Sequence, residues 1–259
     1  MKTLLIIGIG AGDPDYITMQ AVKALNRTDL FFLMDKGPAK DALIDLRREL
    51  CERYIERPGY RFVEAPSPER ARGAGVDYQA SVAELNRDKQ RTFERLIDEE
   101  LADGETGAFL VWGDPALYDS TIRILRAILD SGRCVFEFEV IPGITSVQAL
   151  AAQHKVPLNR IGRPVEITTG RRLAAGQVSA ADSLVVMLDA EDAYRQVADQ
   201  DLEIYWGAYL GTPQQLLIAG RLGDVAAEIE RVRKAARQAN GWIMDTYLLR
   251  KPLLRKPED

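Results

Sequence analysis

The sequence contains few residues that bind metals or form disulfides. It has two cysteines, Cys51 and Cys134, and one histidine, His154, in 259 residues. Two cysteines far apart in the chain form neither a disulfide framework nor a metal knuckle, and a lone histidine excludes the common structural zinc sites. A Ser-His-Asp hydrolase would have to use His154, and no G-x-S-x-G motif accompanies it. We therefore expect chemistry without a metal, with inert thiols and a histidine at the edge of the core.

Long apolar runs and an excess of positive charge are also missing. No stretch approaches the roughly 20 apolar residues that span a bilayer. The apolar start is broken by glycines and lacks a small-residue cleavage site, so we expect a first strand, no membrane contact and a cytoplasmic protein. The formal net charge of −5 argues against a nucleic-acid partner, which needs a basic face. Most basic residues are arginine, which suits carboxylates or phosphates, although a solvated surface explains the same excess.

The first half of the chain alternates strand and helix patterns. The run over residues 107–112 is uninterruptedly apolar, as in a strand buried on both faces. Residues 117–129 have apolar side chains at helical spacing, with Tyr118 on the apolar stripe. This alternation predicts an α/β domain with a mostly parallel sheet and right-handed crossovers. The other expected strands are 3–9, 30–34 and 134–141, and the other expected helices are 16–26, 39–54 and 78–101.

The turn Pro142-Gly143 is the expected domain boundary. It divides the chain into a first domain, 1–143, a second domain, 144–251, and a tail, 252–259. Residues 57–77 are rich in proline, glycine and charge, which fits either a mobile loop or an ordered insertion. In the second domain we expect helices at 144–152, 190–197 and 224–237, and strands at 165–168, 183–188, 203–206, 216–219 and 242–247.

The first strand ends in a glycine-rich loop, GIGAGDP, at residues 8–14. The dinucleotide fingerprint G-x-G-x-x-G requires glycine where Asp13 stands, and a carboxylate there repels phosphates. A ligand with a positive centre, or one with hydroxyl groups that donate to Asp13, fits better, and S-adenosylmethionine, a sulfonium without phosphate, is such a ligand. The alternative is structural, with Asp13 or Asp15 capping a helix N-terminus.

Two further loops follow predicted strands. They are WGDP at residues 112–115 and PGITS at 142–146. Parallel strands present their carboxyl-end loops at one edge of the sheet. We therefore expect all three loops to meet in a cleft between the domains.

These motifs resemble the tetrapyrrole methylase family. The resemblance rests on IIGIGAGDPDYIT, FLVWGDPALYDSTIRIL and VIPGITSVQAL, and continues through EITTG, SLVVMLD and GTPQQLLIAGRLGDV over nearly the whole chain. Two positions depart from the family pattern. The family often has proline where Ala11 stands, and Met-Gly where Leu188 and Asp189 stand.

The resemblance implies two αβα domains, an active site in the interdomain cleft, a homodimer, and S-adenosylmethionine as methyl donor without a metal. Its most specific strings, such as PLNRIGRPVEITTGRR and GWIMDTYLLR, imply methylation of C-1 of precorrin-5 with loss of acetate in aerobic cobalamin synthesis. The alternative within the family is methylation of another precorrin carbon.

The resemblance and the chemistry together assign site residues. We expect Asp114 to accept hydrogen bonds from the methyl donor and not to act as a base. Acetate release needs a group that manages a proton, and we expect Tyr118 and Asp119 in that role, although core packing explains Tyr118 equally well. The carboxylate arms of the substrate need cations, for which Arg171 and Arg172 are the first choice, Arg160 and Arg163 the next, and solvated loop arginines the alternative. Asp13 is also expected at the substrate. The expected cofactor contacts are Ala11, Trp112, Gly113, Asp114, Leu117, Thr145, Ser146, Leu188 and Gly211.

Two rival functions also fit parts of the sequence. A Rossmann-type methyltransferase or oxidoreductase would use the first glycine loop and Asp35, but it leaves the second and third loops unexplained. A non-catalytic tetrapyrrole-binding protein would retain the fold, and titration with S-adenosylmethionine would distinguish it.

Overall fold

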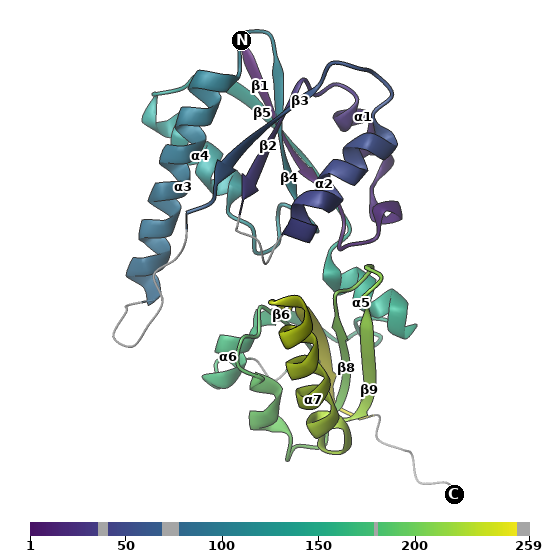
Figure 1. Ribbon diagram of the computed structural model, residues 1–259. Coiled ribbons are helices and arrows are strands. Elements are labelled where there is room, and N and C mark those ends of the chain that lie inside the picture. The colour runs from purple at the N-terminus through teal and green to yellow at the C-terminus, as the bar shows by residue number, and fades with distance from the viewer. Residues whose placement is uncertain (36–40, 69–77, 179–180, 253–259) are drawn as a thin grey trace, which may run out of the picture. The chain divides into compact units, whose positions relative to one another are not determined.

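The computed structural model describes residues 1–35, 41–68, 78–178 and 181–252. The chain divides into two compact units, Met1–Thr145 and Ser146–Asp259. Each unit contains a five-stranded sheet with helices packed on it (Figure 1). The α/β class predicted from the sequence is confirmed.

The sheet of the first unit is parallel throughout, in the order β3-β2-β4-β1-β5. The run Leu4 to Ile7 of β1 is fully buried, because helices cover both faces of a parallel sheet. The strands are β1 (Lys2–Gly8), β2 (Leu30–Asp35), β3 (Arg61–Pro66), β4 (Thr106–Val111) and β5 (Phe136–Ile141).

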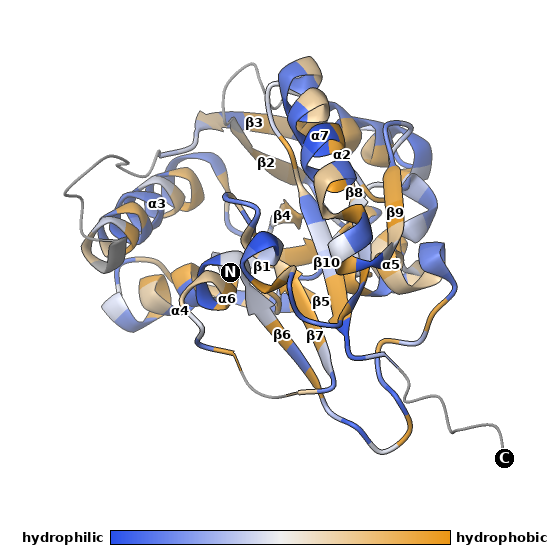
Figure 2. Cartoon of the chain, turned by 90° about the horizontal axis from the view of Figure 1, so that it is seen from below, coloured by the Kyte–Doolittle hydropathy of each residue, from blue (hydrophilic) through white to orange (hydrophobic). Residues whose placement is uncertain are grey.

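Each face of this sheet has its own core, because successive side chains of a strand point to opposite faces. Leu5 and Ile7 pack with α1 and α2, whereas Leu4 and Ile6 pack with α3 and α4. Figure 2 shows mixed polar and apolar residues along α3, as expected for a helix with one buried side. The chain thus leaves β1 towards one face and leaves β4 towards the other. The helices are α1 (Met19–Leu25), α2 (Asp41–Tyr54), α3 (Tyr78–Glu100) and α4 (Thr121–Ser131).

In the first unit, the structure resolves part of a segment that the sequence left open and moves the start of a predicted helix. The segment 57–77 contains an edge strand, β3, which pairs with β2 through Phe62 and its neighbours, and residues 69–77 of that segment lie outside the described residues. The helix expected from residue 117 begins at Thr121 instead. Both differences arise where tertiary pairing or a local side-chain hydrogen bond overrides apolar spacing.

The sheet of the second unit is mixed, in the order β6-β7-β10-β8-β9. Among the strands of the described residues, β6 and β7 pair in parallel, and the other pairs are antiparallel. The last strand begins three residues later than residue 242, where the sequence predicted it. The strands are β6 (Val165–Thr169), β7 (Ser183–Met187), β8 (Glu203–Ala208), β9 (Leu216–Arg221) and β10 (Asp245–Arg250).

The core of the second unit is built around large aromatic side chains. Trp206, Tyr194 and Tyr247 are fully buried, and the last two rings meet edge to face with their centroids 5.6 Å apart. The short helix α6 was not predicted, since five residues carry too little periodicity. The helices are α5 (Ser146–His154), α6 (Gly170–Ala174), the 3-10 helix η3 (Ala193–Val197) and α7 (Leu222–Asn240).

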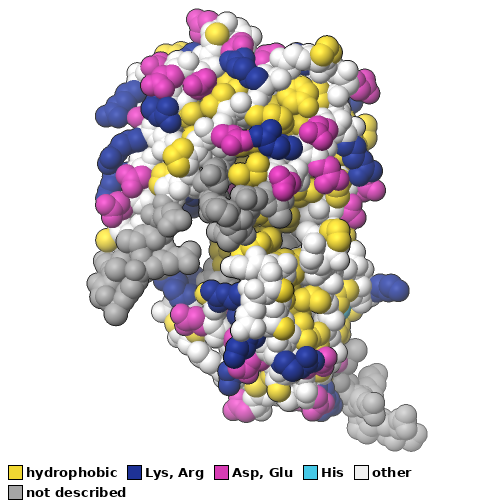
Figure 3. Space-filling view, viewed as in Figure 1, with side chains coloured by type: hydrophobic (Ala, Val, Ile, Leu, Met, Phe, Trp, Pro, Cys, Tyr) yellow, Lys and Arg dark blue, Asp and Glu magenta, His cyan; other side chains and the backbone are white. Residues whose placement is uncertain are grey.

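Much of the arginine excess lies in surface ion pairs. Arg53 pairs with Asp15 at 2.6 Å, and Arg195 with Glu230 at 2.9 Å. Basic and acidic side chains are intermixed on the face shown in Figure 3. Such exposed pairs contribute little stability. Over the described ranges, no helix combines the length and the apolar character needed to cross a bilayer.

Candidate functional site

Three glycine-containing turns meet at the carboxyl ends of β1, β4 and β5. The turn at residues 8–13 leads from β1 to one face of the sheet, and the turn at 112–115 leads from β4 to the other. Since β1 and β4 are neighbours, the two turns flank a topological switch point, where open α/β sheets bind ligands. The third turn, at 142–145, follows β5 on the other side of β1.

The turns touch through their backbones. Gly10 and Gly113 exchange two N–H to carbonyl hydrogen bonds of 3.3 and 2.8 Å. A Cβ atom on Gly8 would lie 2.6 Å from the nitrogen of Gly143 and 2.9 Å from the carbonyl oxygen of Gly113, and a Cβ atom on Gly143 would overlap that same oxygen. Because the φ angles of Gly8 and Gly143 lie outside the left-handed region, glycine is required here for close approach.

Asp114 ties the second turn to the third. Its Oδ2 accepts the N–H of Gly143 at 2.8 Å, and its Oδ1 accepts the N–H of Ala116 at 2.7 Å. Each carboxylate oxygen has capacity for further donors. The carboxylate therefore organises the turns, and its expected contact with a ligand stays a prediction.

We expect Asp114→Ala to lower the free energy of unfolding by about 1–3 kcal/mol, because it leaves the Gly143 and Ala116 N–H groups without their acceptor. Urea denaturation followed by circular dichroism measures this loss. The exposed Asp103 offers a matched control, since Asp103→Ala removes only a weak surface pair with the N-terminus. Equal stabilities of the two variants would contradict the role of Asp114.

The first turn also contains a helix cap. Oδ1 of Asp13 accepts the N–H of Asp15 at 2.9 Å at the start of the 3-10 helix η1 (Pro14–Tyr16). Asp13 therefore caps η1, as the structural alternative expected. Its contact with the substrate stays a prediction. Ala11 is buried, and its expected contact with the methyl donor stays a prediction.

Tyr118 does not lie on a helix stripe, and the core-packing alternative for it is wrong. Its side chain is 46% exposed and its φ is 53°. Oδ1 of Asp119 accepts the N–H of Thr121 at 2.7 Å, an Asx-type bond that separates this turn from α4. Left-handed non-glycine residues are strained and concentrate at functional sites. The catalytic role of Tyr118 and Asp119 stays a prediction, placed now on an exposed turn.

The expected site residues of the second unit lie at one edge of its sheet. β6, β7 and β8 run in the same direction, so the turns after them share that edge. The turns after β7 and β8 carry Leu188 and Gly211. Ser146 lies here too, because its Oγ is 2.9 Å from Oγ1 of the buried Thr246 at the start of β10. Thr246 was not predicted, since a single threonine inside an apolar strand gives no signal.

The turn after β7 is held by a buried network. Leu188 is 61% exposed with φ 54°. Oδ2 of the next residue, Asp189, accepts the Tyr247 hydroxyl at 2.7 Å and the Ala193 N–H at 2.8 Å, and its carbonyl accepts from Arg233. Burial and the adjacent Asp189 raise the pKa of Tyr247, so the phenol remains a donor. Asp189, which stands where the family often has glycine, thus anchors the turn that carries the exposed Leu188.

The four candidate arginines for carboxylate binding differ in their surroundings. Arg172 donates from Nε and a terminal nitrogen to the carbonyl of Gln177 at 3.2 and 3.1 Å, closing its own loop. Arg160 lies 3.4 Å from Asp182. Arg163 and Arg171 are exposed. Binding of substrate by Arg171 and Arg172 stays a prediction.

His154 and Cys51 have structural surroundings. Nε2 of His154 lies 3.0 Å from the carbonyl oxygen of Trp206, which can only accept, so Nε2 carries the hydrogen. Burial lowers the pKa of His154 and keeps the ring neutral. Burial raises the pKa of Cys51 to about 12, so its thiol is protonated. Among the described residues, no group of three His, Cys, Asp or Glu side chains is arranged to hold a metal ion.

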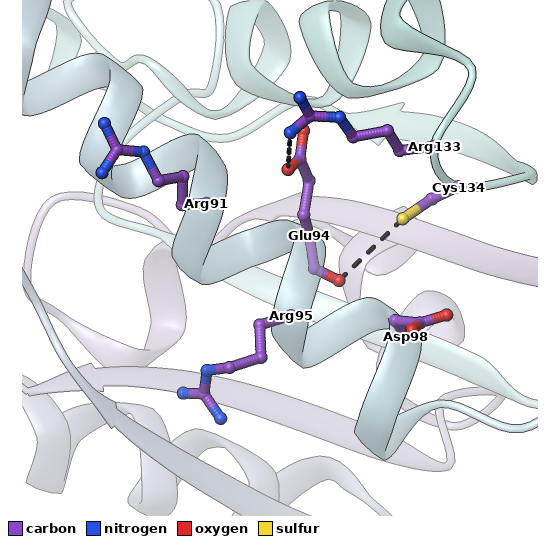
Figure 4. Close-up of a pocket in the computed structure, with 6 residues that line it drawn as sticks. All are labelled: Arg91, Glu94, Arg95, Asp98, Arg133 and Cys134. Carbon is purple, nitrogen blue, oxygen red and sulfur yellow. Dashed lines mark hydrogen bonds and ion pairs between the residues drawn. The ribbon is translucent and has the colours of Figure 1, made fainter.

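A shallow surface cavity lies elsewhere on the first unit (Figure 4). It is next to Cys134, which precedes β5, and therefore lies at the amino ends of the strands, opposite the glycine turns. Arg133 in its wall is paired with Glu94 at 3.2 Å. Its position and its internal ion pair separate it from the site at the turns. The lining residues are Arg91, Glu94, Arg95, Asp98, Arg133 and Cys134.

Comparison with known proteins identifies relatives over nearly the whole chain. The family model Tetrapyrrole (Corrin/Porphyrin) Methylases matches residues 3–226. The chain is 50% identical over 251 residues to a precorrin-6A synthase (deacetylating) of Sinorhizobium sp, covering 97% of this chain and 96% of that protein. The crystal structure of a cobalamin-synthesis-related protein, CobF, from Corynebacterium diphtheriae superposes with a TM-score of 0.82 at 36% identity, covering 97% and 99% of the two chains. A uroporphyrin-III C-methyltransferase from Thermus thermophilus, solved with S-adenosylhomocysteine, shares the fold with a TM-score of 0.56 at 19% identity, covering 95% and 96%.

Proposed function

The chain belongs to the tetrapyrrole methylase family, and from this membership we propose that it transfers a methyl group from S-adenosylmethionine to C-1 of precorrin-5 and releases acetate, giving precorrin-6A. The observation that carries the proposal is the 50% identity to a precorrin-6A synthase over 97% of the chain. The proposal places the enzyme in aerobic cobalamin synthesis.

The turns of the first unit fit S-adenosylmethionine. Cβ atoms on Gly8 and Gly143 would lie 2.9 Å or less from neighbouring backbone, so these turns bring main-chain groups, and not side chains, together at the carboxyl ends of the strands. The charged side chains that the described turns contribute, Asp13 and Asp114, are acidic and suit a cationic sulfonium without phosphates. In this proposal the methyl donor contacts Ala11, Trp112, Gly113, Asp114, Leu117, Thr145, Ser146, Leu188 and Gly211.

The chemistry demands alignment more than strong acids or bases. The substrate carbon attacks the methyl carbon in line with the departing thioether, and the positive charge of the sulfonium is lost as the new carbon–carbon bond forms. The protein accelerates such a step by orientation and by excluding water. Release of acetate adds water across an acetyl carbonyl and breaks the bond to the macrocycle, so a proton has to be moved. Tyr118 and Asp119 are proposed for that transfer because they follow Asp114 on an exposed turn.

Further parts of the proposal rest on the family resemblance. They are a homodimer in the cytoplasm, an active site that uses no metal, and contact of the substrate with Asp13, Arg171 and Arg172. Methylation of another precorrin carbon is the alternative within the family.

Incubation with methyl-labelled S-adenosylmethionine and enzymatically prepared precorrin-5 tests the proposal. We expect one labelled methyl group in the macrocycle and one free acetate per turnover, measured by mass spectrometry. Heat-denatured protein is the control. A labelled macrocycle without acetate would favour the alternative carbon, and binding of S-adenosylmethionine without any transfer would contradict the enzymatic function.

A further inference from the structure

The loop between β8 and β9 carries Gly211, a predicted contact with the methyl donor. The loop spans residues 209–215. Gly211 and the buried Tyr209 both have left-handed backbones, with φ angles of 79° and 50°. Thr212 donates from its N–H and from Oγ1 to the carbonyl of Tyr209 at 3.0 and 2.8 Å. A left-handed non-glycine residue is strained and persists only where its surroundings hold it, so the hydrogen bonds of the loop keep it in this conformation.

The side chain of Gln215 bonds to the main chain of Gly211. Its Oε1 accepts the N–H of Gly211 at 2.9 Å. Its Nε2 donates to Oε1 of Gln153, near the end of α5, at 3.0 Å. Because a main-chain N–H can only donate, the oxygen of the Gln215 amide has to face Gly211 and the nitrogen has to face Gln153. Gln215 therefore joins the loop to α5, which lies beside the loop end of β8 and β9 in Figure 1.

α5 offers Gln215 a fixed partner, because the helix is bonded to the sheet at both ends. At its start, the hydroxyl of Ser146 bonds to that of Thr246 in β10. At its end, Nε2 of His154 lies 3.0 Å from the carbonyl oxygen of Trp206 in β8. Ser146 is itself a predicted contact with the methyl donor. Gln215 thus connects the loop with a helix that begins at a second predicted contact.

The bond to Gln215 decides which main-chain group of Gly211 is left for a ligand. The N–H of Gly211 is taken up by the Gln215 side chain. The carbonyl oxygen of Gly211 has two lone pairs and can accept from a ligand. S-adenosylmethionine carries matching donors, its amino groups and its ribose hydroxyls. A methyl donor at this loop therefore meets Gly211 as a hydrogen-bond acceptor.

We propose that Gln215 is a positioning residue for S-adenosylmethionine, which occupies the N–H of Gly211 and holds the Gly211 carbonyl in place to accept from the methyl donor. The inference rests on the proposed function, which places the methyl donor at Gly211. Sequence reasoning selected Gly211 and not Gln215, because a glutamine in a loop gives no sign of what its side chain bonds to.

Gln215→Leu tests the positioning role, since leucine has a similar volume and cannot bond to Gly211 or Gln153. We expect the Kd for S-adenosylhomocysteine and the KM for S-adenosylmethionine to rise about tenfold, equivalent to ~1.4 kcal/mol. The kcat and the KM for precorrin-5 are expected to stay within about twofold of wild type, because Gln215 acts on the methyl donor alone. Calorimetric titration and initial rates measure these values.

Gln214→Leu is the matched control. Gln214 is the neighbouring glutamine of the same loop, is exposed, and bonds to Thr212 through its main-chain N–H at 3.3 Å. We expect this variant to change the Kd for S-adenosylhomocysteine by less than about twofold. A loss in Gln214→Leu equal to that in Gln215→Leu would mean that any change in the loop weakens binding, which would overturn the positioning role.

Gln215→Glu separates the bond to Gly211 from the bond to Gln153. Glutamate keeps an oxygen that accepts the N–H of Gly211 and loses the N–H donated to Gln153. We expect its Kd for S-adenosylhomocysteine within about threefold of wild type. The amide hydrogen of Gly211, followed by NMR, is expected to exchange faster in Gln215→Leu and not in Gln215→Glu. Equal losses of affinity in both variants, or no loss in Gln215→Leu, would overturn the positioning role.

The outcomes also distinguish this inference from the proposed function. A wild-type protein that methylates precorrin-5, together with an unchanged Kd for S-adenosylhomocysteine in Gln215→Leu, would overturn the positioning role alone. A wild-type protein that binds S-adenosylhomocysteine without methylating precorrin-5, together with weaker binding in Gln215→Leu, would overturn the proposed function and support the positioning role.

Discussion

Gly143→Ala is expected to weaken binding of S-adenosylhomocysteine at least about tenfold and to slow methyl transfer about a hundredfold, the order of loss that follows a misplacement of about 1 Å. The new Cβ atom would overlap the carbonyl oxygen of Gly113 and lie 2.8 Å from the carbonyl carbon of Gly8. Because these neighbours are backbone, they cannot turn aside as a flexible side chain would. The turn at 142–145 has to move, and the hydrogen bond from Gly143 to Asp114 is broken.

We expect the effect of Gly143→Ala to be steric and local, and a second glycine-to-alanine variant serves as its control. Gly223 lies in α7, and a Cβ atom there meets its nearest neighbour, the carbonyl oxygen of Ala198, at 3.3 Å. Gly223→Ala is expected to retain binding, since alanine is the better helix former. Calorimetric titration measures both affinities, and circular dichroism shows whether each variant folds. A folded Gly143→Ala protein that binds the ligand as wild type does would remove these turns from the cofactor site.

Arg233→Met is expected to lower the free energy of unfolding by about 3–5 kcal/mol, the usual cost of leaving a buried charge without its partner. Arg233 is only 5% exposed. Its Nε donates to Asp245 at 2.9 Å, and a terminal nitrogen lies 3.0 Å from Asp192. Burial lowers the pKa of Arg233, but the carboxylates of Asp245, Asp192 and Asp189 outweigh burial and raise it. The guanidinium therefore stays charged and holds these acids together.

The loss in Arg233→Met should depend on pH with a defined sign. Burial raises the pKa of Asp245 in the folded protein, and removal of the guanidinium raises that pKa further. A carboxyl group with a folded pKa above its unfolded value binds its proton more tightly when folded, so the variant gains stability as the pH falls through the folded pKa. The difference from wild type is thus largest at neutral and alkaline pH and shrinks towards acid pH.

Denaturation by urea at several pH values measures this dependence. Arg231, exposed on the same helix, gives the control variant Arg231→Met, for which we expect a change within about 0.5 kcal/mol. A pH-independent loss in Arg233→Met would mean that packing, and not charge compensation, accounts for the role of Arg233. Because the network anchors the turn of Leu188, the proposed function also predicts weaker binding of S-adenosylhomocysteine in this variant.

The alternation of strands and helices was predictable from the sequence alone. Buried strands such as β1 and β4 are short apolar runs bounded by glycine, and the periodicity of α3 is long enough to be unambiguous. The sequence misplaced the start of α4 and left the segment 57–77 open, because one local bond and one distant partner decide these features. The carboxylate of Asp119 accepts the N–H of Thr121, so α4 begins at Thr121 and not at residue 117. The charged segment around Phe62 forms a strand because it pairs with the edge of β2.

The presence of a glycine turn after each of three strands, and the way Asp13 disfavours a dinucleotide, could be derived without any structure, because backbone freedom and charge are properties of single residues and their neighbours. The packing of Gly8, Gly113 and Gly143 against one another, and the anchoring role of Asp189, emerge only in the folded protein. Those contacts join residues far apart in the chain, and their energies depend on burial and on distances that exist only after the sheet has formed.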